Sequence, residues 1–163
     1  MILPDSGERR QFDSGAVRDI AQGKGRCDLL PLDIIGERMG HDCLLHINEY
    51  LYKGDPDQLW ATLILFLRYR NMETHTGILE VAKHFEDGAA KYGDRNWEKG
   101  IPVHCYIDSA VRHYLKYYRG DKDEPHDRAF MWNILCAMWT HKHHPELIDI
   151  PANKPTKEEY ECK

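Results

Sequence analysis

The chain lacks the features that would point to secretion, membrane insertion or binding of long nucleic acids. Its five cysteines are scattered and never form a CxxC pair, so neither a disulfide framework nor a zinc knuckle is expected. The most apolar segment, 59–67, is too short to span a bilayer, and the N-terminal residues carry charges where a signal peptide needs an apolar stretch. With 22 Lys and Arg against 27 Asp and Glu, the net charge of −5 disfavours duplex nucleic acid as a partner. We therefore expect a cytoplasmic protein without a membrane partner.

Common catalytic motifs are missing as well. The sequence contains no GxSxG, Walker A, HExxH or dinucleotide-binding motif, which sets aside serine hydrolases, P-loop proteins, zincins and Rossmann enzymes. Any chemistry must therefore come from a less regular group of side chains.

The composition is that of one globular domain. The 163 residues are 42% hydrophobic and 30% charged, which is enough to bury one core and far from the signature of disorder. Apolar side chains recur at helical spacing, interrupted by glycines and prolines. The pattern predicts helices at 32–53 with a break near Gly40, 57–71 with Asp57 as its cap, 77–92, 103–119 and 125–142. Strands are possible only as short pieces, so the predicted class is all-α.

The predicted architecture is a compact helical bundle with a loop-rich N-terminal arm. Residues 1–31 carry four glycines and little periodicity, which is typical of such an arm. We assign 1–145 to a single helical domain and 146–163, rich in charges and prolines, to a poorly ordered tail. The segment 59–67 is apolar on almost every side, so it must be buried in the core or in an oligomer interface.

A glycine-rich basic turn is the first candidate for ligand binding. Residues 23–26 read Gly-Lys-Gly-Arg, and the glycines allow backbone amides and the Lys24 and Arg26 side chains to approach a phosphate closely. The alternative is a solvent-exposed basic turn without a ligand. The four residues alone leave both interpretations open.

A second candidate is the loop KYGDRNWEKG at 91–100, between two predicted helices. Trp97 offers a flat face to a base, Asn96 can pair with a base edge through two hydrogen bonds, and Lys91 and Arg95 can reach phosphates. Equally, an aromatic side chain in such a loop often only covers the core, with the charges forming surface pairs.

Polar side chains also share faces of the helix predicted at 103–119. Asp108 and Arg112 are four residues apart and lie on one face, as do Ser109 and His113.

Acidic residues follow at the start of the next helix. Glu124 and Asp127 are three residues apart, so both carboxylates can point the same way, as a Mg²⁺ or Mn²⁺ ion requires. Glu86 lies beside His84 on an earlier helix. The alternative is that acids at a helix N-terminus serve only capping and the helix dipole.

Three separated blocks of the sequence resemble a known family in the same order. These are GAVRDIAQGKGRCDLLP, then HFEDGAAKYGDRNWEKGIP, then DSAVRHYLKYYRGDKDEPH followed by WNIL. Together they resemble the N-terminal domain of phage and bacterial dATP/dGTP diphosphohydrolases, small helical proteins related to MazG-like pyrophosphohydrolases. The chain departs from the family pattern by about forty extra residues, at 33–77. This helical insertion either builds a dimer interface or reshapes the pocket for a different ligand.

The resemblance implies a metal-dependent reaction on a (deoxy)nucleoside triphosphate. A metal-activated water attacks the α-phosphate and releases pyrophosphate and a nucleoside monophosphate, with Mg²⁺ (or Mn²⁺) bridging phosphate oxygens. MazG-like proteins carry an ExxE pair on one helix and an ExxD pair on the next. Glu124 and Asp127 match ExxD, whereas the helix with Glu86 offers no clean ExxE.

The sequence predicts a role for each of these residues. The candidate metal ligands are Glu86, Asp108, Glu124 and Asp127, of which Glu86, Glu124 and Asp127 are the candidate catalytic residues. The candidate substrate-binding residues are Lys24, Arg26, Lys91, Arg95, Arg112, His113 and Lys116, mainly for phosphates, with Asn96 and Trp97 at the base.

Two other functions remain open at this point. A phage protein that sequesters a nucleotide or a nucleotide-derived immune signal needs the cations and aromatics but not the full carboxylate set, so the incomplete ExxE favours it. A helical assembly protein would leave the basic and aromatic residues without a purpose. The resemblance further implies a homo-oligomer and, for a phage-encoded protein, the host cytoplasm as its location.

Overall fold

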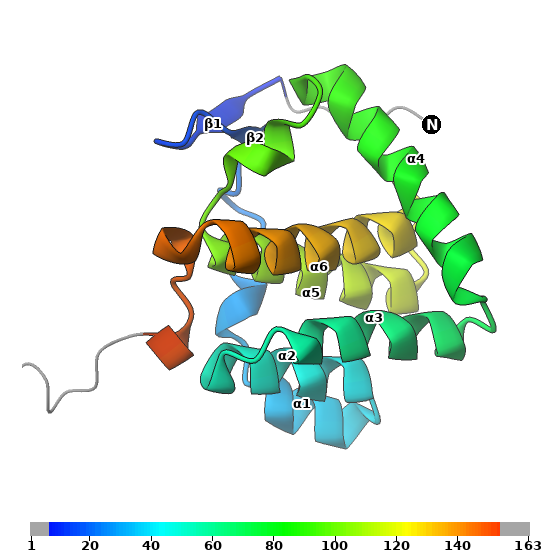
Figure 1. Ribbon diagram of the computed structural model, residues 1–163. Helices are drawn as coiled ribbons and strands as arrows, with labels where there is room; N and C mark the ends of the chain where they lie inside the picture. Colours follow the sequence, from blue (N-terminus) through cyan, green and yellow to red (C-terminus); the bar gives the residue numbers. More distant parts are fainter. Residues whose placement is uncertain (1–6, 154–163) are drawn as a thin grey trace, which may run out of the picture.

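The computed structural model describes residues 7–153, and the predicted all-α class is confirmed for them (Figure 1). The helices are α1 Leu32–Met39, α2 Asp42–Lys53, α3 Asp57–Tyr69, α4 Thr74–Tyr92, α5 Val103–Arg119 and α6 His126–His143. Short 3-10 helices follow the arm and the longer helices: η1 Cys27–Leu29, η2 Asn96–Lys99, η3 Pro145–Leu147 and η4 Pro151–Asn153. The arm contains a small antiparallel hairpin of β1 Arg9–Gln11 and β2 Val17–Asp19.

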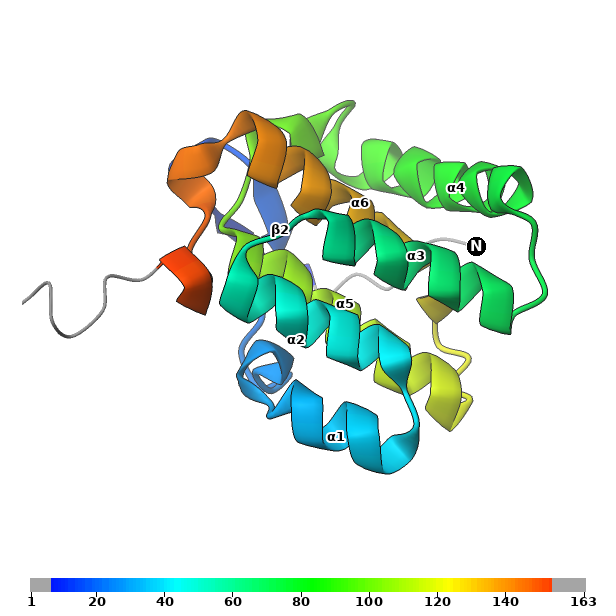
Figure 2. The same cartoon turned by 60° about the horizontal axis from the view of Figure 1, so that its bottom comes forward.

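The paired helices α5 and α6 form the centre of the bundle. The helices α1, α2 and α3 lie on one side of this pair, and α4 lies on the other side, against α6 (Figures 1 and 2). The hairpin of the N-terminal arm lies beside η2, to which β2 is bonded through Val17 and Asn96 (Figure 1).

The apolar core fills the space between α3, α5 and α6. Phe66 of α3 packs edge-on against Phe130 of α6 with ring centroids 4.6 Å apart, and Tyr114 of α5 lies 5.2 Å from the same ring. All three side chains are fully buried. The apolar helix α3 is therefore buried largely within the core of its own chain, with Ile64 and Leu65 only half-buried.

Helix boundaries agree with the sequence pattern to within two residues, except at the start of α4. The break near Gly40 is real, because Gly40 adopts a left-handed conformation with φ of 68°. Asp57 is the first residue of α3 and not its cap, and its amide donates to Asp55 Oδ1 over 3.0 Å. The helix α4 begins at Thr74 and not at 77, because the Glu73 carboxylate accepts hydrogen bonds from two amides of the first turn.

The described part of the predicted tail packs against the bundle. Ile150 is fully buried in the core, and the Asp149 carboxylate accepts a hydrogen bond of 2.9 Å from the backbone amide of His104 at the start of α5. Residues 154–163, the remainder of that predicted tail, lie outside the described residues. None of the described helices is long and apolar enough to cross a membrane.

The ion pair between His104 and Asp149 makes the stability of this segment depend on pH. The hydrogen bond that His104 Nδ1 donates to the Asp149 carboxylate raises the pKa of His104 to about 10, above the value of about 6.5 expected in the unfolded chain. Because the folded pKa is the higher one, the pair contributes its full stability below about pH 6.5 and loses it between there and pH 10. We expect His104→Gln to lower the melting temperature most near pH 6 and least near pH 10. A difference that stays constant between these pH values would contradict this assignment.

Candidate functional site

A cavity of about 410 Å³ lies between the arm, α4, η2, α5 and the start of α6. This volume is within the range of small-molecule binding sites. The cavity wall combines cations with acidic and aromatic side chains, so it offers complementary surfaces to a ligand that is both anionic and flat.

Most of the residues predicted from the sequence line this one cavity. The basic turn, the 91–100 loop, the polar face of α5 and the acidic loop before α6 all contribute to it. The predicted residues in its wall are Lys24, Lys91, Arg95, Asn96, Trp97, Asp108, Arg112, His113, Lys116 and Glu124.

Three predicted residues lie elsewhere. Arg26 forms a two-point ion pair with Asp28, with N to O distances of 2.7 and 2.6 Å, and borders a separate, more open pocket. Asp127 pairs with Arg70 at 2.7 Å, and Glu86 is exposed on α4 outside the cavity wall. The four candidate metal ligands therefore do not converge on one point. Spacing along a helix could not predict this, because it does not reveal the ion-pair partners.

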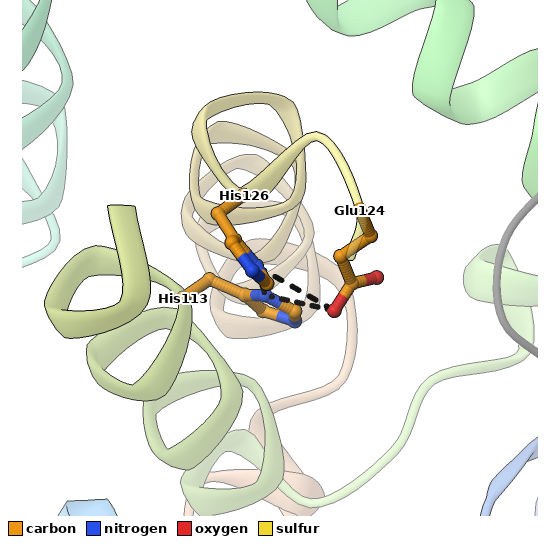
Figure 3. Close-up of side chains that lie close together, drawn as sticks. All are labelled: His113, Glu124 and His126. Atoms are coloured by element: carbon orange, nitrogen blue, oxygen red, sulfur yellow. Dashed lines mark hydrogen bonds and ion pairs between the residues drawn. The ribbon is translucent and has the colours of Figure 1, made fainter. Parts of the chain in front are cut away.

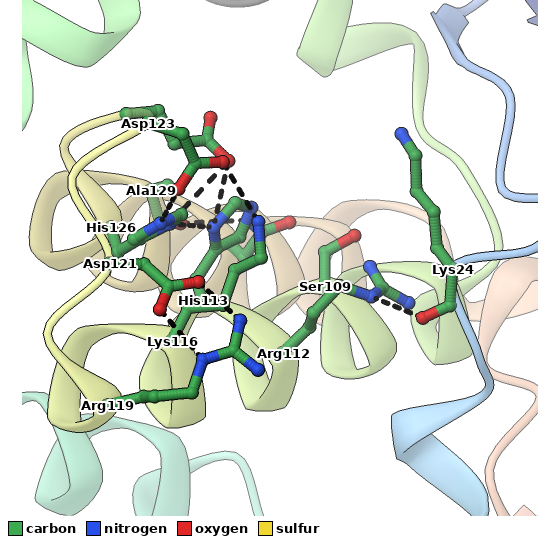
Figure 4. Close-up of polar contacts among 12 residues, drawn as sticks. Lys24, Ser109, Arg112, His113, Lys116, Arg119, Asp121, Asp123, His126 and Ala129 are labelled. Atoms are coloured by element: carbon green, nitrogen blue, oxygen red, sulfur yellow. Dashed lines mark hydrogen bonds and ion pairs between the residues drawn. The ribbon is translucent and has the colours of Figure 1, made fainter.

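Three cations, Lys24, Arg112 and Lys116, belong to the cavity wall (Figure 4). The Arg112 guanidinium donates to the carbonyl oxygens of Lys24 and Gly25 over 3.2 and 3.0 Å and also pairs with Asp108, which fixes the glycine-rich turn against α5. Burial lowers the pKa of Lys24, an effect that Asp19 opposes and Arg112 reinforces. Cations in one cavity wall favour an anionic ligand.

Glu124 belongs to the same wall and lies beside two histidines (Figure 3). Its Oε1 atom is 3.4 Å from His113 Nδ1 and 3.6 Å from His126 Nδ1, and the two Nδ1 atoms are 3.0 Å apart. Burial raises the pKa of the Glu124 carboxyl and lowers the pKa of His113 well below its usual value. Two imidazoles and a partly buried carboxylate are groups that can hold a cation or move a proton.

Aromatic side chains also belong to the cavity wall. Trp97 packs edge-on against Phe85, with centroids 5.4 Å apart, and Trp132 lies 5.9 Å from His84. Within the described residues, His84 Nδ1 and Trp132 Nε1 are buried without a hydrogen-bond partner. Burial lowers the pKa of His84 to about 4, so its ring is neutral near pH 7. Unpaired buried nitrogens in a cavity wall are groups that a ligand can satisfy.

Asn96 makes a paired hydrogen bond, but its partner is the arm. Its Oδ1 accepts from the amide of Val17 over 3.1 Å and its Nδ2 donates to the Val17 carbonyl over 3.0 Å. The two-point recognition predicted for a base is therefore made with the backbone of β2. In this position Asn96 holds the arm over the cavity.

Sequence reasoning missed Arg18 and Asp19, which β2 places in the cavity wall. Arg18 donates to Asn133 and Ser109 over 3.0 and 3.3 Å, and Asp19 accepts from Lys91 over 3.0 Å. Both residues stand in the GAVRDI part of the first sequence block, which is the only signal that could have identified them.

The position of β2 should depend on Asn96. Asn96→Ala removes both bonds to Val17, which costs about 1–2 kcal/mol of local stability because the freed groups are partly buried. We expect amide hydrogen exchange at Val17 to become roughly tenfold faster. Asp94→Ala, an exposed position in the same loop, is the matched control and should leave exchange unchanged. Equal exchange in both variants would show that other contacts hold β2.

Residues 62–150, more than half of the chain, match the family described as dATP/dGTP diphosphohydrolase, N-terminal. The matched range contains the cavity residues of α4, η2, α5 and α6 and also 62–77, the last part of the predicted insertion. No curated protein and no solved structure matched the chain.

Proposed function

The chain belongs to the dATP/dGTP diphosphohydrolase N-terminal family, as its sequence motifs indicate, and from this premise we propose that its cavity binds a purine (deoxy)nucleoside triphosphate and hydrolyses it. The products are a nucleoside monophosphate and pyrophosphate.

One observation carries the proposal: Lys24, Trp97, Arg112 and Glu124 line the same cavity. They come from four segments that are far apart in the sequence and that were identified by separate patterns. Cations, an indole and a carboxylate in one wall match the three parts of the reaction, which are phosphate binding, base binding and attack by water.

In the proposed reaction the triphosphate lies against Lys24, Arg112 and Lys116. These cations neutralise the charge that grows on the departing pyrophosphate. Glu124 orients a water molecule and accepts its proton, which its raised pKa favours. The water oxygen forms a bond to the α-phosphorus, the bond from that phosphorus to the bridging oxygen breaks, and pyrophosphate leaves.

The four carboxylates predicted for Mg²⁺ do not fit a protein-built magnesium site. Glu86 lies outside the cavity wall, Asp127 is paired with Arg70, and Asp108 is paired with Arg112. Mg²⁺ or Mn²⁺ is instead proposed to arrive with the nucleotide, whose phosphate oxygens supply most of the ligands that such an ion needs.

The proposed activity is tested by incubating the protein with each dNTP and NTP and Mg²⁺ or Mn²⁺, followed by chromatography of the products. We expect the monophosphate and pyrophosphate from purine substrates, with no product in EDTA. Glu124→Gln should reduce turnover by about 100-fold or more while the protein stays folded. Glu37→Gln, on the exposed face of α1, is the control that should keep full turnover. Equal rates for both variants would remove Glu124 from the reaction.

The purine preference is proposed from the indole nitrogen of Trp132. Trp132 Nε1 can only donate a hydrogen bond, and it is buried in the cavity wall without a partner within the described residues. Adenine and guanine share an N7 acceptor, which pyrimidines lack. A donor to N7 would therefore accept both purines of the family's description and disfavour pyrimidines.

Analogues without N7 test this contact. We expect 7-deaza-dGTP to bind about tenfold or more weakly than dGTP, because the buried indole N–H would stay unpaired. In Trp132→Phe the two ligands should bind equally, since the donor is gone. A preference for dGTP that persists in Trp132→Phe would place N7 recognition elsewhere.

Sequestration without hydrolysis is the second candidate. Glu86 and Asp127 do not converge with Glu124. This supports sequestration, because binding a nucleotide requires the cations and aromatic side chains but not a full set of carboxylates. It predicts that the protein retains nucleotide in the presence of EDTA and returns it intact on denaturation, with no monophosphate formed.

A further inference from the structure

Two histidines and a glutamate converge where α5 meets the start of α6. Each of the three pairs of facing atoms, His113 Nδ1, His126 Nδ1 and Glu124 Oε1, lies between 3.0 and 3.6 Å apart. Figure 3 shows the imidazole edges and the carboxylate directed toward one another. The atoms come from α5, from the loop that follows it and from the first residue of α6, so the packing of α5 and α6 brings them together.

These separations match donors around a single metal ion. Donors about 2.1 Å from one ion lie about 3.0 Å apart at octahedral angles and about 3.4 Å apart at tetrahedral angles. The two shorter separations, 3.0 and 3.4 Å, agree with this, and the third, 3.6 Å, is only slightly longer. We propose that His113, Glu124 and His126 form a binding site for one divalent transition-metal ion.

The contacts of His126 support this assignment independently. Its Nε2 lies 2.8 Å from the Asp123 Oδ1, and a carboxylate can only accept, so Nε2 carries the proton. In the neutral ring Nδ1 then presents its lone pair toward the cluster. Histidines that bind metals usually donate their other ring N–H to a carboxylate in this way, which fixes the ring orientation.

The donor set selects the class of metal. Two imidazole nitrogens and one carboxylate oxygen suit Mn²⁺, Fe²⁺, Co²⁺ or Zn²⁺, whereas Mg²⁺ prefers oxygen ligands throughout. The sequence pattern indicated a carboxylate set for Mg²⁺ or Mn²⁺, whereas the proposed site contains more nitrogen than oxygen donors.

A neighbouring group of potential ligands is less suited. Asp121, Asp123 and His126 also lie close together. However, Asp121 is paired with Arg119 and Asp123 is paired with Lys116, so cations already compensate both carboxylates. The histidine pair with Glu124 is therefore the preferred site.

The site faces the cavity, because His113 and Glu124 belong to its wall. Three protein donors leave coordination positions open to water or to phosphate oxygens. Since Oε1 is the Glu124 atom directed at the histidines, Oε2 remains for the attacking water of the proposed function. The inference adds to that function, but metal binding by itself can be measured without any nucleotide.

The test is titration of EDTA-treated protein with Co²⁺, followed by its visible absorption. We expect one ion per chain with the spectrum of a site containing nitrogen ligands, displaced by Zn²⁺ and unaffected by excess Mg²⁺. His113→Gln and Glu124→Gln should each weaken Co²⁺ binding by more than about tenfold, and Asp123→Asn by about 10–100-fold. Because Asp123 is half-exposed, the last variant tests the site without removing a buried side chain.

Two controls separate this site from other histidines. His84→Gln changes a histidine in the same cavity outside the cluster, and His143→Gln changes an exposed histidine at the end of α6. Both should keep Co²⁺ affinity. No Co²⁺ spectrum, equal competition by Mg²⁺, or loss of binding only in His143→Gln would overturn the site. Turnover of nucleotide without Co²⁺ binding would overturn it and leave the proposed function intact, whereas Co²⁺ binding without turnover would support the site and count against hydrolysis.

Discussion

The packing of α5 against α6 is the contact on which the rest of the structure depends. One face of α5 places Val111 and Tyr114 in the core, and the neighbouring face places Arg112 and His113 in the cavity wall. Because a helix turns by about 100° per residue, these faces cannot move independently. The position of the site is therefore fixed by the apolar packing behind it, and α6 contributes His126 from the opposite side of the same contact.

The cavity exists because distant segments are tied to this pair of helices by polar contacts. Arg112 holds the carbonyls of Lys24 and Gly25, and Asn96 holds the backbone of Val17. The N-terminal arm also buries Ala16 and packs Phe12 against the core, so these hydrogen bonds act together with apolar contacts. The result is a wall in which cations from the arm face acidic and histidine side chains from the bundle (Figure 4).

The sequence predicted the helices well because their apolar spacing and terminal glycines are local signals, as at Gly40 and Gly120. It also identified most of the cavity wall, since residues such as Lys24 and Trp97 stand out from the helical pattern. It could not reveal that Asp127 pairs with Arg70 or that Asn96 binds Val17, because those partners are more than fifty residues away. The facing of His113 and His126 likewise depends on the angle between two helices, which spacing alone does not encode.

The central claim is that this cavity is a purine nucleotide site with the triphosphate beside Glu124. A crystal structure with α,β-imido-dGTP, in which the bond to be broken is replaced, tests it most directly. The account predicts the triphosphate between Lys24 and Arg112, the α-phosphate near Glu124 and the base beside Trp132. An analogue bound outside the cavity, or bound with its base at Glu124 and its phosphates among the aromatic side chains, would contradict it.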